Sequence, residues 1–473
     1  MSDRRTVLTR AGVRVLAGAA GLAATLAVVT AVFTLPLPSA QAQPASRAVT
    51  PVPAAASVAC PGPLLQLGSG TSTSTLSALS APTVVSGGDD SSPASVPFTA
   101  ADVQEGGTAP QAFEEKAKDA AREPLLAGAQ SSESSTEDMR GLSVANCAQP
   151  DFDHWLVGGA TSLGSTTLVE LGNPGDVAAT VDIEAYSEQG LAAAAGGTGI
   201  LVQPHTQRVV PLAGLVPNAS ATVVHVTSTG GTVSAELQES EISGVTPQGD
   251  EWVGPTASPS KKLVIPGAVF DGSGLSTATA TDSSDGGVPV LRVLPVGTKD
   301  AKVTIGVKPD AGKGGGTALS ATASHGVVSE IPLEKAGTGT FTVTIDSTEP
   351  LVAAVHTSTV DTKRGTDFAW YAAAAPLTGA AALPIAPGPG AVLHLVNTSS
   401  AAVKLKLSGP NGGTVSVPAG GSVSRKVAKP GVLTTSDGHG VYASVSYAAS
   451  GMVGAYVAYP TSASASALTV YRR

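Results

Sequence analysis

The sequence predicts an all-β protein built from three tandem immunoglobulin-like β-sandwich units, and two observations support this class. The 473 residues include only 13% charged and 4% aromatic side chains, and small and β-branched residues suit many short strands separated by Gly and Pro. A strand–turn–strand pattern also occurs three times, at residues 168–186, 291–309 and 393–410. We therefore expect repeated sheets rather than helices.

A second pattern recurs at nearly the same spacing and predicts a hairpin in each unit, at residues 221–237, 341–355 and 441–457. Each unit also opens with a short apolar strand that runs into a turn. About seven strands in about 100–120 residues match the size of an immunoglobulin-like sandwich. A β-propeller is the alternative, and we disfavour it because propeller blades span only about 40–45 residues.

These patterns divide the chain into an N-terminal hydrophobic helix, a low-complexity segment clipped by a disulfide, and three sandwiches. The predicted boundaries are a signal peptide or membrane anchor over 1–42, a linker and disulfide module over 43–150, and sandwiches over 151–258, 259–378 and 379–473.

The N-terminus predicts export from the cytoplasm. Four arginines precede an uncharged run over residues 15–37, which is long enough to span a bilayer at about 20 residues. Ala40-Gln41-Ala42 resembles a signal-peptidase site. A cleaved signal peptide and an uncleaved anchor therefore both stay open, with a lean towards the anchor. In either case the rest of the chain lies outside the cytoplasmic membrane.

Cys60 and Cys147 are the only cysteines, and an oxidising compartment allows them to pair. Closing so long a loop would stabilise the fold by about 4.5 kcal/mol in the chain-entropy model. Two free thiols are the alternative. We therefore predict a disulfide between Cys60 and Cys147.

The disulfide-enclosed segment predicts little independent structure. Residues 69–97 are rich in Ser, Thr, Gly and Ala and poor in large apolar side chains. Residues 113–121 favour a short helix, with Glu114 and Lys118 at i,i+4 spacing. We expect a loose module that lends a strand to the next unit.

Several motifs resemble an actinobacterial family of exported proteins catalogued as domain of unknown function 5719. They are Cys147-Ala-Gln-Pro, Trp155-Leu-Val-Gly-Gly, Leu171-Gly-Asn-Pro-Gly, Ala179-Thr-Val-Asp-Ile, Ser228-Thr-Gly-Gly-Thr-Val, Gly249-Asp-Glu-Trp-Val and Leu263-Val-Ile-Pro-Gly. The resemblance covers most of the chain from Cys60 onward. It implies an envelope-associated protein with an N-terminal hydrophobic segment, and it implies no catalytic residues.

The sequence offers no convincing catalytic, metal or cofactor motif. The seven histidines are scattered, and His225 and His356, the two that fall at the hairpin patterns, belong to different units, so we interpret them as exposed strand residues rather than metal ligands. A G-x-S-x-G nucleophile motif is absent. No Lys/Arg cluster occurs beyond the N-terminus and the net charge is −9, which disfavours nucleic acid as a partner. We expect no enzyme activity and no cofactor.

Three aromatic residues are candidates either for ligand contact or for packing at junctions between units. Trp252 precedes the second sandwich, and Trp370 with Tyr371 occupies the equivalent place before the third. One aromatic site per junction favours a wedge between units over a sugar platform.

The sequence leads to two functional hypotheses. The first is an exported or membrane-anchored envelope protein that acts as a non-catalytic scaffold or adaptor for other envelope proteins. The alternative is a carbohydrate-binding module for cell-wall polymer that uses Trp252 and Trp370. Burial of both rings would remove the sugar platform that the alternative needs.

Overall fold

The computed structural model shows a mostly β chain with several sheets, which confirms the all-β class. Val52–Ala465 form one compact body, and Met1–Pro51 with Ser466–Arg473 form a second part. The structure describes residues 18–20, 22–24, 26, 46–49, 55–68, 76–79, 81–89, 92–96, 98–105, 108–117, 124–193, 195–271, 287–310, 316–459 and 468–471.

Among its described residues, the second part contains one pair of strands. Its strand β1 (Ser46–Val49) pairs antiparallel with β36 (Leu468–Tyr471). Most of the predicted hydrophobic segment over 15–37, and all of the cleavage site at 40–42, lie outside the described residues. Within the residues that are described, no helix has the length and hydropathy needed to cross a membrane.

Repeat 1 (151–258) contains two antiparallel sheets whose strands alternate along the chain. Counting β15 and β16 together as its fourth strand, one sheet has the order first, sixth, third and fourth, and the other has the order eighth, seventh, second and fifth. The elements are β12 (Asp153–Val157), β13 (Ser165–Asn173), β14 (Ala179–Ser187), β15 (Gly190–Leu191), η2 (Ala195–Gly197), β16 (Ile200–Val202), β17 (Thr206–Pro211), η3 (Leu212–Gly214), β18 (Thr222–Gly230), β19 (Ser234–Ser243) and β20 (Thr246–Val253).

Repeat 2 (259–378) follows the same order, but one long strand, β26, serves as both the sixth and the seventh strand and so joins the two halves. Its elements are β21 (Ser260–Phe270), β22 (Val290–Pro295), β23 (Ala301–Pro309), β24 (Thr317–Ala323), β25 (Ser329–Pro332), η5 (Glu334–Ala336), β26 (Gly339–Asp361) and β27 (Gly365–Ala372).

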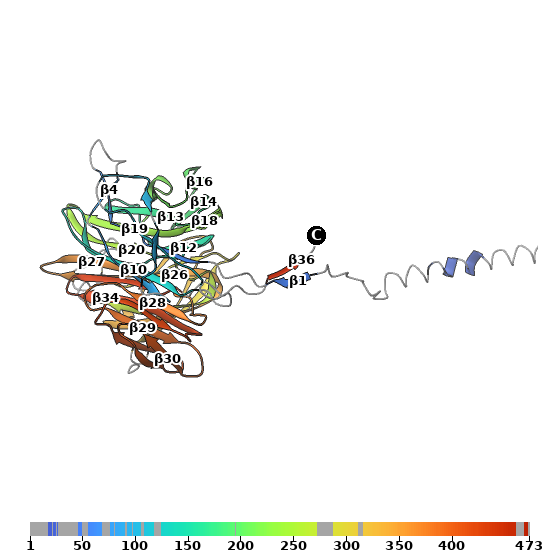
Figure 1. The fold of residues 1–473 in the computed structure, drawn as a ribbon. Coiled ribbons are helices and arrows are strands. Elements are labelled where there is room, and N and C mark those ends of the chain that lie inside the picture. Colours follow the sequence, from blue (N-terminus) through green and yellow to red (C-terminus); the bar gives the residue numbers. More distant parts are fainter. Residues whose placement is uncertain are drawn as a thin grey trace, which may run out of the picture. The chain divides into compact units, whose positions relative to one another are not determined.

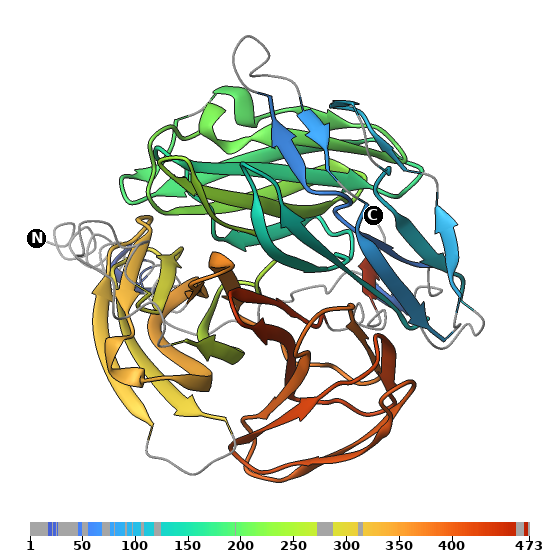
Figure 2. The same cartoon turned by 90° about the vertical axis from the view of Figure 1, so that its left-hand side faces the viewer.

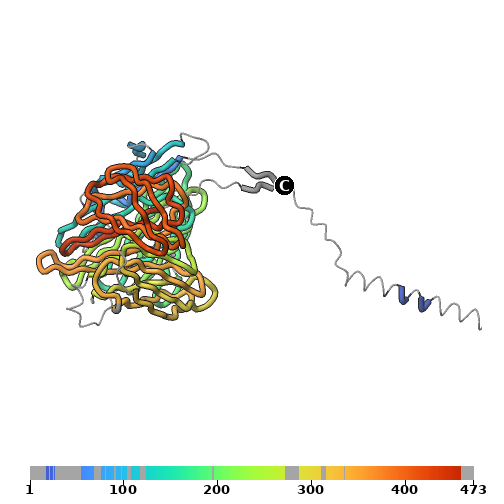
Figure 3. Tube along the Cα trace, turned by 90° about the horizontal axis from the view of Figure 1, so that it is seen from below, coloured from blue at the N-terminus to red at the C-terminus, as the bar shows by residue number. Residues whose placement is uncertain are grey.

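The part of repeat 3 (379–473) that lies in the compact body has the same strand order, in two separate four-stranded sheets. Its strands there are β28 (Ala381–Ile385), β29 (Val392–Asn397), β30 (Val403–Ser408), β31 (Gly413–Val417), β32 (Gly421–Lys426), β33 (Gly431–Thr435), β34 (Val441–Ala449) and β35 (Met452–Val457). The tube trace follows the chain from blue through green and yellow to the red strands of this repeat (Figure 3).

The N-terminal segment adds a partial fourth copy of this arrangement, with counterparts of six of the eight strands, which corrects the prediction of a loose module. Its sheets β2-β9-β6 and β11-β10-β5 correspond to the orders first, sixth, third and eighth, seventh, second. Its strands are β2 (Ala56–Ala59), β3 (Leu65–Leu67), β4 (Leu76–Ala78), β5 (Thr83–Gly88), β6 (Ala94–Val96), β7 (Thr99–Ala100), β8 (Val103–Glu105), β9 (Ala112–Glu115), β10 (Leu126–Ser135) and β11 (Arg140–Asn146). We call this segment the N-terminal repeat.

Two details of the N-terminal repeat bear on the predictions. The helix expected over 113–121 is wrong where it is described, because β9 is a strand between β2 and β6. Phe113 packs there against the disulfide that joins Cys60 and Cys147, so tertiary packing outweighs local helix propensity. The disulfide is confirmed. Strand β7 pairs with β17 of repeat 1, which confirms that this region lends a strand to the next one.

The eighth strands of the four repeats meet at the centre of the body. Each of β11, β20, β27 and β35 contacts the next, and β35 contacts β11, so the four form a closed ring. Figure 2 shows the blue, green, yellow and red groups of strands arranged around this centre. Several of the strands that meet or pack there are labelled in Figure 1. We call the line along which these strands meet the axis.

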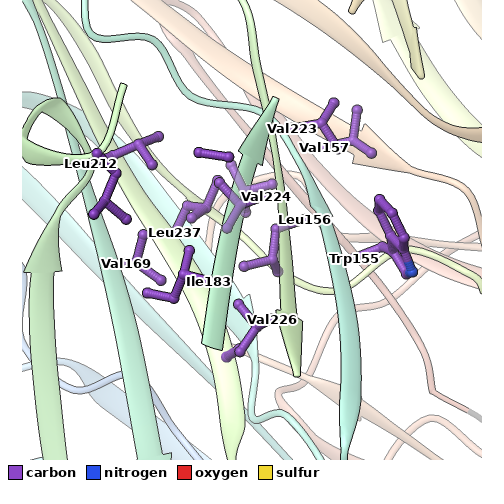
Figure 4. Packing of buried hydrophobic residues seen from close by; sticks show 14 of the residues in the cluster. Trp155, Leu156, Val157, Val169, Ile183, Leu212, Val223, Val224, Val226 and Leu237 are labelled. Atoms are coloured by element: carbon purple, nitrogen blue, oxygen red, sulfur yellow. The ribbon is translucent and has the colours of Figure 1, made fainter. Parts of the chain in front are cut away.

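The hydrophobic cores continue from one repeat into the next. In repeat 1 the core residues Leu156, Val226 and Leu237 are fully buried, and Trp155 lies at the margin of the cluster (Figure 4). The same cluster includes Trp370 of repeat 2. The core of repeat 3 likewise includes Val144 of the N-terminal repeat. Shared cores explain why the four repeats form one compact body.

The strand pairings also correct the second sequence pattern. In repeat 1 the predicted hairpin at 221–237 is wrong, because β18 and β19 belong to different sheets. In repeat 3 the pattern at 441–457 falls on β34 and β35, which do form a hairpin but are the seventh and eighth strands. Alternation along a strand identifies its buried face and not its pairing partner, so the sequence could not distinguish these cases. The pairings do not confirm the immunoglobulin-like class.

Candidate functional site

The predicted aromatic residues lie on eighth strands at the axis and are buried. Trp252 on β20 is 2% exposed, and Trp370 and Tyr371 on β27 are 3% and 2% exposed. Neither indole ring offers an open face to a sugar. The two tryptophans have different neighbours. Trp252 packs against Leu64 of the N-terminal repeat, and Trp370 packs in the core of repeat 1.

Trp370 belongs to a buried charged cluster between repeats 1 and 2, which we call the Arg292 seam. The Arg292 guanidinium donates from Nε and Nη2 to Glu330 Oε1 at 3.0 and 2.8 Å. Its Nη1 donates to the carbonyl of Gly159 at 2.7 Å. The guanidinium carbon lies 4.4 Å from the centre of the Trp370 ring, in cation–π geometry. Trp370 Nε1 donates to Glu239 Oε2 at 2.7 Å.

Burial shifts two ionisable groups of the Arg292 seam. Desolvation raises the pKa of Glu239, although the nearby Arg292 charge and the hydrogen bond from Trp370 act against the rise. Desolvation, together with the Arg292 charge, lowers the pKa of His356 to about 4. Such shifts are common at active sites. Here, however, the cavity measures only about 30 Å³, which holds about one water molecule. The Arg292 seam therefore has shifted pKa values like those of an active site, but its cavity is too small for a substrate.

A second buried cluster lies on the axis and consists of three carboxylates, Asp250, Glu251 and Asp367. Glu251 accepts backbone N–H groups of Val144 and Ala455, at 3.0 and 3.3 Å. These two donors belong to the N-terminal repeat and repeat 3, whereas Glu251 belongs to repeat 1. The carboxylate therefore connects three repeats through their backbones.

Asp367 of repeat 2 makes the matching contacts. Its Oδ2 accepts the N–H groups of Leu142 and Val453, at 3.1 and 3.0 Å. Burial raises the pKa of Glu251 and of Asp367 well above their usual values, the neighbouring carboxylates add to the rise, and the N–H donors act against it. Burial also raises the pKa of Asp250.

A third buried cluster lies between repeats 2 and 3. It places an aspartate, a histidine and a serine in the order of the catalytic triad of a serine hydrolase. His394 Nδ1 lies 3.1 Å from Asp310 Oδ2, and its Nε2 lies 2.7 Å from Ser446 Oγ. Burial alone would raise the pKa of Asp310, but hydrogen bonds from His394 and a neighbouring serine hold it below its usual value. His394 and Ser446 are only 1% and 2% exposed, and the backbone at Gly267 covers the imidazole. A substrate cannot reach the hydroxyl, so we interpret the cluster as a structural connection.

The two histidines considered as metal ligands lie in different surroundings. His225 is on the outer face of β18, with its ring nitrogens 3.1 and 3.2 Å from Glu184 and Asp153. His356, interpreted from the sequence as an exposed strand residue, is instead partly buried against Trp370. Within the described ranges, no group of three or more His, Cys, Asp or Glu residues has the geometry to hold a metal ion.

Two larger cavities are open to small molecules. One, of about 480 Å³, lies between repeats 2 and 3 and is lined mainly by Gly, Thr and backbone, with Lys308 at one side. The other, of about 400 Å³, is lined by Trp155, Tyr459, Asp151 and Asp153. Both have the volume of ordinary ligand sites, about 300–1,000 Å³. Only the second combines aromatic rings with charged groups.

Sequence reasoning identified the axial strands but missed the acids on them. Glu251 and Asp367 directly precede Trp252 and Phe368, where the apolar part of each strand begins. An acid in an apolar strand signals a buried contact, because an unpaired buried charge is costly. The sequence contains no signal for the contacts of His394, because its partners Asp310 and Ser446 lie far from it in the chain.

Comparison with known families gives one match. The profile of a family of unknown function, DUF5719, matches residues 99–429, which is more than half of the chain. Comparisons with curated proteins and with solved structures find no match.

Proposed function

The chain belongs to the DUF5719 family of unknown function, and on that premise we propose that it is a non-catalytic scaffold or adaptor of the cell envelope. The contacts on the axis are the observation that carries this proposal. Carboxylates of repeats 1 and 2 accept backbone N–H groups from the N-terminal repeat and from repeat 3. Such contacts hold four repeats in fixed positions, which suits the presentation of surfaces to partners.

The proposed location is outside the cytoplasmic membrane, with the chain either anchored through residues 15–37 or released after cleavage. The arginines before the apolar run support export. The disulfide between Cys60 and Cys147 supports the same location, because disulfides persist in oxidising compartments.

On fold class, we propose that the repeats are two-sheet sandwiches related to the immunoglobulin-like type in size and antiparallel build. Their strand order differs, however, since the first, third, fourth and sixth strands share a sheet. In an immunoglobulin constant domain the first, second, fourth and fifth strands share one. The repeats are closer to the eight-stranded double-sheet sandwiches of the jelly-roll class.

A pull-down tests the scaffold hypothesis. The full chain, immobilised, is exposed to a detergent extract of the envelope, and an unrelated exported β protein serves as the control bait. Specific recovery of the same envelope proteins in replicate experiments supports an adaptor. Retention of the chain on purified wall glycan, without protein partners, contradicts it and supports carbohydrate binding instead.

Carbohydrate binding is the alternative function, and one observation favours it. Trp252, Trp370 and Trp155 are all buried, at 2%, 3% and 8% exposure, but the cavity of about 400 Å³ places Tyr459 beside two carboxylates.

A further inference from the structure

The cavity beside Trp155 lies where the connections between repeats converge. Residues 149–150, 255–258 and 375–378 include its lining residues and follow β11, β20 and β27, and Tyr459 follows β35. Because the four eighth strands meet on the axis, the segments that leave them meet at one end of it. We call this space the axial cavity. Ligand sites occur preferentially at such meeting points between units.

Two aromatic side chains of the axial cavity are held in fixed positions. The His225 ring stacks on Trp155 with centroids 3.9 Å apart and an interplanar angle of 9°. Contacts to Asp153 and Glu184 hold His225 in place. The Tyr459 hydroxyl lies against Gly254, where an added Cβ would come within 2.5 Å of it. Rings that are already fixed lose little conformational freedom when a ligand binds.

The charge of the axial cavity is negative. Asp151 and Asp153 line it, and its described lining contains neither Lys nor Arg. The one lining histidine, His154, is buried, and desolvation lowers its pKa, so it stays neutral at pH 7. Phosphates and acidic sugars are therefore repelled, whereas neutral and cationic groups are accepted.

The remaining lining favours a ligand that carries hydroxyl groups. Gln149, Ser258 and Thr378 present uncharged polar side chains, which both donate and accept hydrogen bonds. Carboxylates accept hydroxyl hydrogen bonds, and aromatic rings pack against apolar C–H faces. A sugar ring combines hydroxyl groups with such faces, and a cavity of about 400 Å³ accommodates one or two rings.

We propose that the axial cavity binds a neutral or amino sugar residue. This binding goes beyond the scaffold function and does not depend on it. It also places the sugar contact at Tyr459 and the two carboxylates, because Trp155 is 8% exposed and His225 covers one face of its ring.

Calorimetric titration of the full chain tests the proposal. The probes are a tetramer of N-acetylglucosamine, a tetramer of glucosamine, a trimer of galacturonate as the acidic sugar, and tetralysine as a cationic peptide. We expect at least one of the first two to bind and the galacturonate trimer not to bind. Absence of binding by both tetramers at millimolar concentration would overturn the proposal, and so would preferential binding of tetralysine.

Substitutions in the axial cavity test whether the sugar binds there. Asp151→Asn removes one exposed carboxylate of the cavity and should weaken sugar binding about tenfold or more, since hydrogen bonds to charged groups are strong. Tyr459→Leu should also weaken it. Glu334→Gln makes the same charge change at an exposed position of repeat 2 and should leave the affinity unchanged. Equal affinities for all four proteins would place the sugar elsewhere and refute the proposal, while leaving the pull-down result of the scaffold hypothesis untouched.

Discussion

The axis and the Arg292 seam both bury carboxylates between repeats, but they stabilise them differently. At the seam, Glu330 pairs with a guanidinium, and Glu239 accepts the Trp370 N–H within reach of the same cation. On the axis, Glu251 and Asp367 accept backbone N–H groups from neighbouring repeats. Burial raises the pKa of the axial acids strongly. The seam therefore depends on one cation and the axis on the position of β11, while burial raises a carboxyl pKa in both regions.

Loss of the disulfide should give the largest effect, because Cys147 directly follows β11. Cys60→Ser with Cys147→Ser opens a loop with a sequence separation of 87 residues. The chain-entropy model predicts a loss of about 4.5 kcal/mol in the free energy of unfolding. Denaturant unfolding followed by tryptophan fluorescence measures the change. An unchanged unfolding midpoint would mean that the N-terminal repeat is held by the axis alone.

Removal of the cation should break the seam and leave the axis intact. Arg292→Met leaves the buried Glu239 and the partly buried Glu330 without their cation, and breaking a buried ion pair costs about 3–5 kcal/mol. The same denaturant titration measures the loss. Lys262→Met, which breaks the exposed pair with Asp346 on the same repeat, is the matched control and should leave the midpoint nearly unchanged. Equal effects of the two variants would contradict a special role for the seam.

Removal of one axial carboxylate should separate the repeats that it connects. Asp367→Ala leaves the buried N–H groups of Leu142 and Val453 without their acceptor, at a cost of about 3 kcal/mol. Hydrogen exchange at these two amides should accelerate more than elsewhere in β11 and β35. Asp361→Ala, at an exposed turn of the same repeat, is the control. Unchanged exchange at both amides would show that the contact contributes little.

The pH dependence of stability tests the acids of the axis. Its expected effect on the free energy of unfolding, for one pH unit and one group, is the smallest of these predictions. The pKa of each axial acid is raised in the folded protein, so the folded state binds more protons than the unfolded state. Stability should therefore fall as the pH rises above the usual carboxyl value of about 4, by up to about 1.4 kcal/mol per pH unit for each group. The fall continues up to the raised folded-state pKa.

Thermal unfolding at a series of pH values measures this slope. Glu251→Gln removes one titrating group from the axis and should make the slope shallower. Asp346→Asn removes an exposed acid and should leave it unchanged. An unchanged slope in Glu251→Gln would mean that Glu251 is already ionised in the folded protein over this pH range.

Much of the fold follows from local sequence, and the candidate sites do not. The strands that contain Val181, Val303 and Leu405 were predictable because apolar residues alternate with polar ones along them. The N-terminal repeat escaped prediction because most of its strands are short and the longer ones are poor in large side chains. They gain stability from packing on the other repeats, as Val144 does in the core of repeat 3.

The sequence by itself determined the strand-rich class, the recurrence of one arrangement of strands, and the pairing of the two cysteines. These properties depend on residue type and on periods of a few residues. Tertiary structure alone decided which sheet each strand joins, the closure of four repeats around an axis, and the meeting of Asp310 with His394 or of Arg292 with Trp370. Those contacts join residues far apart in the chain, and no local pattern encodes a distance between such residues.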